Sequence, residues 1–158
     1  MGLDLTESFS QAAESVLEKL KSTAFARAVL LLEKDGGVTM SVGKSSDLDL
    51  TPFSVLSAAC VSAGQELASL VGESEFRSMV HQGEKISVYL ETVDDHAILG
   101  VIFDKTTTLG LVKLRVGKSR PKLRLILDEA RKLHKPTLTV GTAFAEEARN
   151  QLDELFGG

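Results

Sequence analysis

The sequence predicts an α+β fold in which a five-stranded, mainly antiparallel sheet has helices on its faces. Two continuous apolar runs, within Ala26–Glu33 and Ala97–Phe103, have strand length and no polar alternation, which is typical of strands covered on both sides. Between and around them, four segments repeat apolar residues at helical spacing. The predicted element order is α-β-β-α-β-β-β-α, followed by a C-terminal helix.

The first helix is expected over Asp4–Ser22, where Asp4 followed by Glu7 resembles a capping box. Its apolar face repeats at 3.6 residues per turn through Phe9, Ala13, Val16 and Leu20. After the first buried strand, Asp35-Gly36 supplies the positive-φ residue of a tight hairpin turn. The next strand, from Val38 to Val42, alternates apolar with polar residues, so we expect it to be half exposed.

The second helix has the clearest boundaries. Thr51 is placed to cap it, Pro52 suits the first helical position, and Gly72 ends it. One stripe of the helix is expected to pack on the sheet: Phe53, Leu56, Cys60, Ala63, Leu67 and Leu70. The adjoining face is small or polar: Val55, Ala59, Ser62, Glu66 and Ser69. Because small side chains let another helix approach closely, this face predicts self-association.

Three more strands are expected, near Ser78–Gln82, at Ile86–Val93, and after a turn at Asp94-Asp95. Thr106–Thr108 can cap the next helix, whose apolar positions are Leu109, Val112, Val116, Leu123, Leu127 and Ala130. Gly117 and Pro121 predict a kink, or a break with a restart capped by Ser119. We therefore expect a domain over residues 1–134, and a linker with an acidic amphipathic helix over residues 135–158.

Composition limits the classes of function. The chain has 158 residues, 43% of them hydrophobic, so one domain can bury a core without disulfides or metal. The single cysteine, Cys60, fits a reducing compartment. No apolar run reaches the roughly 18 residues of a membrane span, so we expect a cytoplasmic protein without a membrane partner. A formal net charge of -4 argues against a nucleic-acid partner.

Charge is nevertheless uneven. Nine Lys or Arg lie between Lys113 and Lys135, against Asp128 and Glu129, and the residues that follow are mainly acidic. Such a basic helix can bind phosphates, although a solvated face beside a complementary tail is the more common reading.

No catalytic or nucleotide-binding constellation is present. Two Gly-Lys-Ser fragments, beginning at Gly43 and Gly117, lack the further glycine about five residues upstream that a phosphate-binding loop needs. The three histidines, His81, His96 and His134, have no metal-ligand spacing. We expect no catalytic residue, no cofactor and no metal, and therefore a protein that is not an enzyme.

Three stretches resemble a known family: GESEF at 72–76, HQGEK at 81–85 and VIFDKTTTLGLVKLRV at 101–116. Together with the element order, they are similar to the roadblock family, and within it to MglB-type regulators of bacterial Ras-like GTPases (MglA type). The resemblance implies a homodimer, formed through helix two and an edge strand, that binds the GTP state of such a GTPase. It also implies roles in cell polarity and gliding motility.

By this resemblance, the partner's hydrolysis would be stimulated by ordering its switch segments, without an arginine finger. The implied GTPase-binding residues are Ala59, Ser62, Gln65, Glu66 and Ser69. The implied dimer interface contains Val55, Ala58, Ala59, Ser62 and Ala63. A further contact is possible through the tail, at Phe144, Ala148, Leu152 and Leu155. The alternative is a roadblock scaffold that recruits partners without changing hydrolysis.

Overall fold

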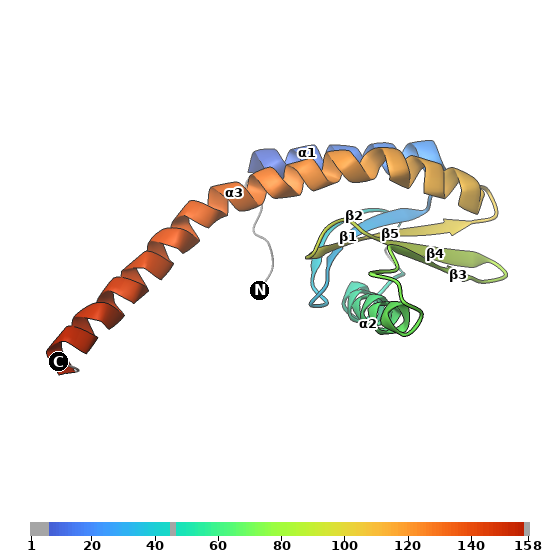
Figure 1. The fold of residues 1–158 in the computed structure, drawn as a ribbon. Helices are drawn as coiled ribbons and strands as arrows, with labels where there is room; N and C mark the ends of the chain where they lie inside the picture. The colour runs from blue at the N-terminus through green and yellow to red at the C-terminus, as the bar shows by residue number, and fades with distance from the viewer. Residues whose placement is uncertain (1–6, 45–46, 157–158) are drawn as a thin grey trace.

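The computed structural model describes residues 7–44 and 47–156, with side chains described for 7–44, 47–133 and 150. Within these residues the elements are α1 (Glu7–Ala24), β1 (Ala28–Glu33), β2 (Val38–Gly43), α2 (Leu50–Leu70), β3 (Ser78–Gln82), β4 (Ile86–Thr92), β5 (Ala97–Asp104) and α3 (Leu109–Phe156). Figure 1 shows three layers: α1 and α3 lie side by side on one face of the sheet, and α2 lies on the other. The predicted α+β class and element order are confirmed.

The sheet is antiparallel throughout, with the order β2-β1-β5-β4-β3. The two continuous apolar runs form its centre, since the whole of β1 pairs with β5, from Ala28 opposite Ile102 to Glu33 opposite Ala97. Both strands are buried on both faces, as predicted. Gly36 has a φ of 102° in the β1–β2 turn, a backbone conformation that glycine adopts without a steric cost.

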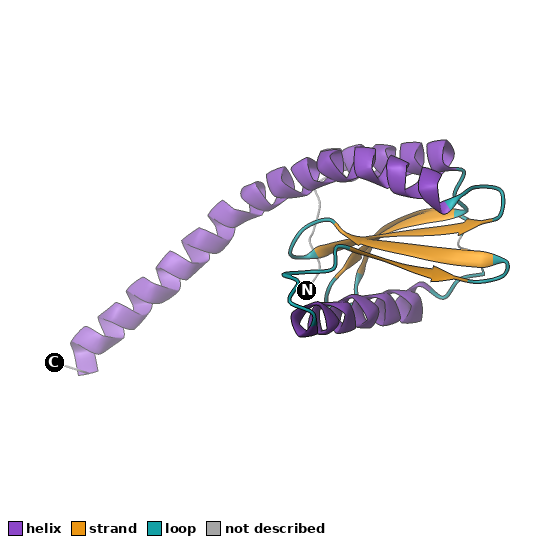
Figure 2. Cartoon of the chain, turned by 45° about the vertical axis from the view of Figure 1, so that its right-hand side comes forward, coloured by secondary structure: helices purple, strands orange, loops and turns teal. Residues whose placement is uncertain are grey.

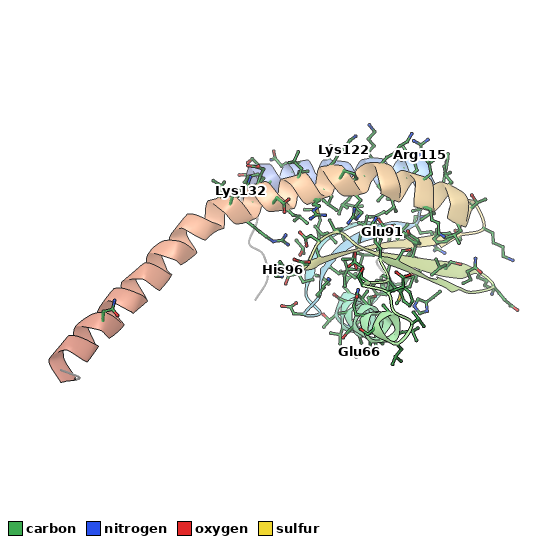
Figure 3. The ribbon with its side chains drawn as sticks, in the orientation of Figure 1. Glu66, Glu91, His96, Arg115, Lys122 and Lys132 are labelled. Atoms are coloured by element: carbon green, nitrogen blue, oxygen red, sulfur yellow. The ribbon has the colours of Figure 1, made fainter. Side chains whose placement is uncertain are left out.

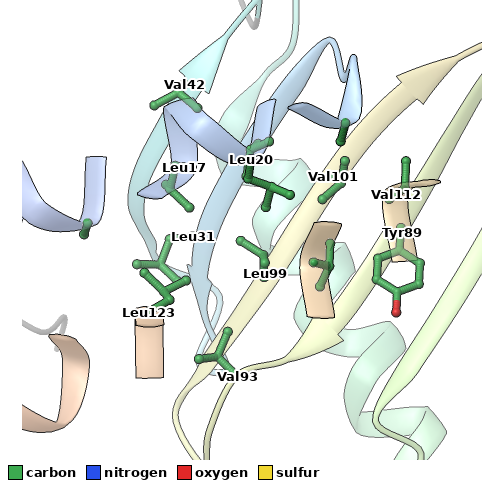
Figure 4. Close-up of a cluster of buried hydrophobic side chains, with 14 of the residues drawn as sticks. Leu17, Leu20, Leu31, Val42, Tyr89, Val93, Leu99, Val101, Val112 and Leu123 are labelled. Carbon is green, nitrogen blue, oxygen red and sulfur yellow. The ribbon is translucent and has the colours of Figure 1, made fainter. Parts of the chain in front are cut away.

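The larger core lies between the sheet and the α1/α3 layer. Figure 4 shows Leu17 and Leu20 of α1 and Leu123 of α3 over Leu31 and Leu99 of the sheet, all of them fully buried. The predicted apolar positions of α1 from Ala13 to Leu20 face this core. Asp4, the predicted cap of α1, lies outside the described residues.

Helix α3 corrects two predictions. It is one 48-residue helix, so the alternative of a break at Gly117 or Pro121 is wrong, and so is the linker over residues 135–141 (Figure 2). Val112, Val116 and Leu123, on either side of the two residues, are fully buried, and their packing outweighs the roughly 3 kcal/mol helix penalty of proline. Because the helix does not turn back, the acidic tail does not fold onto the basic part of the same helix.

The boundaries of the other predicted elements are close to those observed. The predicted threonine cap of α3 is confirmed at Thr108, whose Oγ1 accepts a hydrogen bond of 3.2 Å from the Leu111 N–H. The predicted cap of α2 is wrong by two residues, since α2 begins at Leu50 after Asp49, which makes no side-chain cap bond. Gly72, with a φ of 81°, follows the end of α2 as expected.

Candidate functional site: the outward face of helix α2

The polar side chains that could do chemistry are not brought together. His81 is exposed on β3, and His96 lies in the β4–β5 turn; the side chain of His134 is outside those described. No group of three or more His, Cys, Asp or Glu among the described residues could hold a metal ion. The Gly-Lys-Ser fragments begin at the end of β2 and within α3, neither of which is a loop that can wrap a phosphate.

Two buried carboxylates serve to attach α3 to the sheet. Glu91 accepts a 2.6 Å hydrogen bond from the Tyr89 hydroxyl and lies 3.6 Å from Arg120, whose Nε also donates to the Thr92 carbonyl oxygen at 2.9 Å. Burial, and then the bond to Glu91, raise the pKa of Tyr89 to about 12. These contacts are all internal, so the cluster is structural.

Asp94, in the β4–β5 turn, forms an ion pair with Arg131 of α3. Its other carboxylate oxygen accepts hydrogen bonds from the N–H groups of His96 and Ala97 at 2.8 and 2.9 Å. Burial alone would raise the pKa of Asp94, but the bonds from Arg131 and the two N–H groups outweigh it and hold the pKa below its ordinary value. The predicted turn at this position is confirmed, and it also anchors α3.

Helix α2 packs on the sheet mainly through small residues. Those buried are Ser54, Ser57, Ala58, Val61, Gly64 and Ala68. The Ser54 hydroxyl donates to the Gly37 carbonyl oxygen at 2.9 Å, and a Cβ added at Gly64 would lie 2.9 Å from Met79 Cε of β3. The helix therefore approaches the sheet closely at these positions.

The three leucines of the predicted stripe point outward, which contradicts the prediction for these residues. Leu56, Leu67 and Leu70, expected in the core, are 64%, 54% and 82% exposed. Phe53 and Cys60 are half-buried and pack against the core between α2 and the sheet, as predicted, whereas Ala63 is exposed. Monomeric soluble proteins rarely leave such contiguous apolar surface uncovered, so this face is the strongest candidate for a binding surface.

The outward face has two flanks of different chemistry. Gly64 meets Met79 of β3, so Cys60 and Leu67, at helical spacing from Gly64, lie on the flank next to β3. On the other side, Val55 lies 3.2 Å from a Cβ added at Gly36 in the β1–β2 turn. Ser62 and Ser69 follow Val55 at seven-residue steps and so share this small, polar flank. The flank with Leu56, Leu67 and Leu70, here called the leucine flank, thus lies beside strand β3, whose outer edge is unpaired in the sheet.

The structure places most of the predicted site residues on the outward face. Ala59, Ser62, Glu66 and Ser69 are exposed and Gln65 is half-buried. Figure 3 shows Glu66 on the side of the molecule away from α3. These residues share one surface, and their roles remain predictions.

The predicted dimer residues differ in their exposure to solvent. Val55, Ala59, Ser62 and Ala63 are exposed, but Ala58 is 8% exposed and packs in the core under α2, so it is not offered to a partner. The sequence did not identify Leu56, Leu67 and Leu70 as surface residues, because an apolar stripe predicts burial but does not show whether the same chain or a partner buries it. The side chains of the predicted tail contacts Phe144, Ala148, Leu152 and Leu155 lie outside those described.

By length and composition, α2 could also cross a membrane, as can the core helix of a soluble protein. This differs from the sequence prediction, which expects no run of that length. In the fold, α2 is one layer of a three-layer domain with its small face against the sheet. Its outward face is therefore better explained as a protein-binding surface.

Comparison with known proteins agrees with this architecture. The Roadblock/LC7 domain model matches residues 12–103. The structure of Myxococcus xanthus MglB is 36% identical with a TM-score of 0.75, covering 82% of this chain and 96% of that one. The gliding protein MglB of Thermus thermophilus is 33% identical with a TM-score of 0.75, covering 81% and 97%. A structure described as MglB with tetrameric arrangement is 33% identical with a TM-score of 0.76, covering 82% and 97%. The chain belongs to the Roadblock/LC7 family.

Proposed function

We propose that this protein is a homodimeric regulator that binds a small Ras-like GTPase in its GTP state and stimulates GTP hydrolysis. The observation that carries the proposal is the uncovered apolar face of α2 in a domain of MglB-like structure. Neither a metal cluster nor a nucleotide-binding loop is found in the described residues, so the chemistry would be that of the partner.

The leucine flank suits a second copy of the chain. Leu56, Leu67 and Leu70 are large, apolar and exposed, and they lie beside the unpaired edge of β3. A two-fold axis here would bring the two leucine flanks together and pair the two β3 strands into one continuous sheet. This favours the leucines over Val55 and Ser62 as the centre of the dimer contact.

The small, polar flank suits the GTPase. Ala59, Ser62, Glu66 and Ser69 are exposed in the single chain. A second copy on the leucine flank would leave them accessible, and the small side chains among them would permit close contact with another backbone. Selectivity for the GTP state requires contacts to the switch segments, because these are the parts of a Ras-like protein that differ between nucleotide states.

The position of the arginines supports a mechanism without an arginine finger. Arg115, Arg120 and Arg124 lie on α3, across the sheet from α2, and Figure 3 shows Arg115 and Glu66 on opposite sides of the molecule. Arg120 is moreover held by Thr92 and Glu91. A partner docked on α2 would be stabilised in its switch segments, and its own residues would orient the attacking water.

A multiple-turnover GTPase assay, with and without this protein, tests the proposal. We expect faster hydrolysis, and Arg77→Ala, which changes the exposed arginine preceding β3, should retain it. A loss of about 10³-fold or more with binding intact would instead identify an arginine finger. Binding of the GTP state with no change in hydrolysis would favour the scaffold function.

A further inference from the structure

The outer surface of α3 carries a concentrated positive charge. From Lys113 to Leu127 the helix has six Lys or Arg and no acidic residue, in a chain whose net charge is -4. Four of these cations are exposed: Lys113, Lys118, Lys122 and Arg124. None of the four forms an ion pair or a hydrogen bond within the described residues. In Figure 3, Lys122 points away from the domain on the side opposite Glu66.

Two leucines lie among these cations. Leu114 is 52% exposed and Leu125 is 63% exposed. They are eleven residues apart, about three helical turns, and therefore share one face of α3 with Lys118. Exposed leucines aligned with unpaired lysines are not needed for packing on α1 or the sheet, which uses the opposite face of the helix.

We propose that this face of α3 binds an anionic membrane surface. Helices that lie at a membrane interface place leucines at the boundary between headgroups and acyl chains, and lysines among the anionic headgroups. Long lysine stems can cover apolar surface while the ammonium group stays at the headgroup level. The contact is peripheral: it requires that α3 lie on the membrane and that no helix span it.

Other polyanions fit this surface less well. Proteins that bind single-stranded nucleic acid stack bases on aromatic side chains, and α3 has no aromatic residue between Leu109 and Leu133. A phosphate backbone would also leave the exposed Leu114 and Leu125 without an apolar partner. An acidic peptide is usually held in a groove, whereas this surface is the outside of the α1/α3 layer (Figure 1). The proposal differs from the sequence prediction, in which the composition of the chain indicates no membrane partner. The reason is that cations and leucines share one face of α3, which the net charge does not reveal.

Binding of the full-length protein to vesicles tests the proposal. We expect cosedimentation with phosphatidylcholine vesicles that contain about 30% phosphatidylserine, and none with phosphatidylcholine alone. The double variant Lys118→Glu/Lys122→Glu should reduce binding at least about tenfold. The matched control is Lys44→Glu/Lys85→Glu, which changes the net charge equally at exposed positions off α3 and should retain at least about half of the binding. Circular dichroism verifies that both variants are folded.

A second variant separates a membrane from a soluble polyanion. Leu114→Ser/Leu125→Ser should weaken vesicle binding while leaving any binding to polyglutamate unchanged, because only the membrane offers an apolar layer. The proposal is overturned if anionic vesicles do not bind, if the two charge variants behave alike, or if the serine variant binds vesicles fully. Tighter binding to polyglutamate or duplex DNA than to vesicles would overturn it in favour of a protein or nucleic-acid partner.

Discussion

Truncation of Leu67 tests whether the leucine flank of α2 joins two copies of the chain. Burying a whole leucine side chain is worth about 1.5–3 kcal/mol. Because Leu67 is 54% exposed, Leu67→Ala should lower the free energy of dimerisation by about 1 kcal/mol for each copy of the residue in the interface. A two-fold interface contains the residue twice, which gives about 2 kcal/mol. The dimer dissociation constant should therefore rise about 30-fold.

Sedimentation across a concentration series measures this constant. Leu114→Ala is the matched control, because Leu114 is 52% exposed but lies on α3, on the opposite face of the sheet. The control should leave the dimer constant unchanged, and the monomeric form of either variant should unfold at nearly the wild-type temperature. Equal effects of the two substitutions, or a Leu67→Ala dimer as tight as the wild type, would refute the reasoning.

Three further predictions address the partner, the nucleotide and the anchor of α3. Ser62→Arg should abolish GTPase binding and stimulated hydrolysis by bulk and charge, whereas Ser15→Arg on α1 should not, as a pull-down with the GTP-loaded partner would show. The chain alone should have no micromolar affinity for GTP or ATP in calorimetry, and measurable heat of binding would contradict this. Asp94→Asn should lose about 1–3 kcal/mol of unfolding free energy at pH 7. Because the pKa of Asp94 is lowered in the fold, its contribution to the free energy of unfolding is present above the ordinary pKa of 3.8 and is lost as the pH falls through the folded pKa. Urea unfolding should therefore show a smaller difference between the wild type and Asp94→Asn at pH 3 than at pH 7.

Most of the fold could be predicted because local pattern and tertiary packing agree. The unbroken apolar runs of β1 and β5 predicted strands covered on both faces, and Asp35-Gly36 predicted the hairpin turn between β1 and β2. The alternative of a helix break failed at α3, where Gly117 and Pro121 have poor helix propensity. Their positions are exposed, and the buried residues before and after them keep the helix continuous.

The orientation of α2 could not be predicted for a different reason. Both faces of the helix are apolar or small, so periodicity shows two candidate core faces and does not rank them. The larger side chains of Leu56 and Leu67 favoured the prediction that their face packs on the sheet. The sheet instead receives the face with Gly64, where the helix comes close to Met79 of β3. A glycine within a helix was the one signal of this close contact in the sequence.

The small inner face of α2 has a consequence for its local stability. Ser54, Ser57, Ala58 and Gly64 bury little apolar area, whereas α1 buries Leu17 and Leu20 completely. In a monomer, α2 should therefore open more readily than α1. A second copy that covers the leucine flank would stabilise α2 by mass action. Hydrogen exchange, measured below and above the dimer dissociation constant, should show amide exchange in α2 slowing markedly and exchange in α1 changing little. Equal protection of α2 at both concentrations would mean that its own sheet suffices to hold it, and the apolar face would then need another explanation than a second copy.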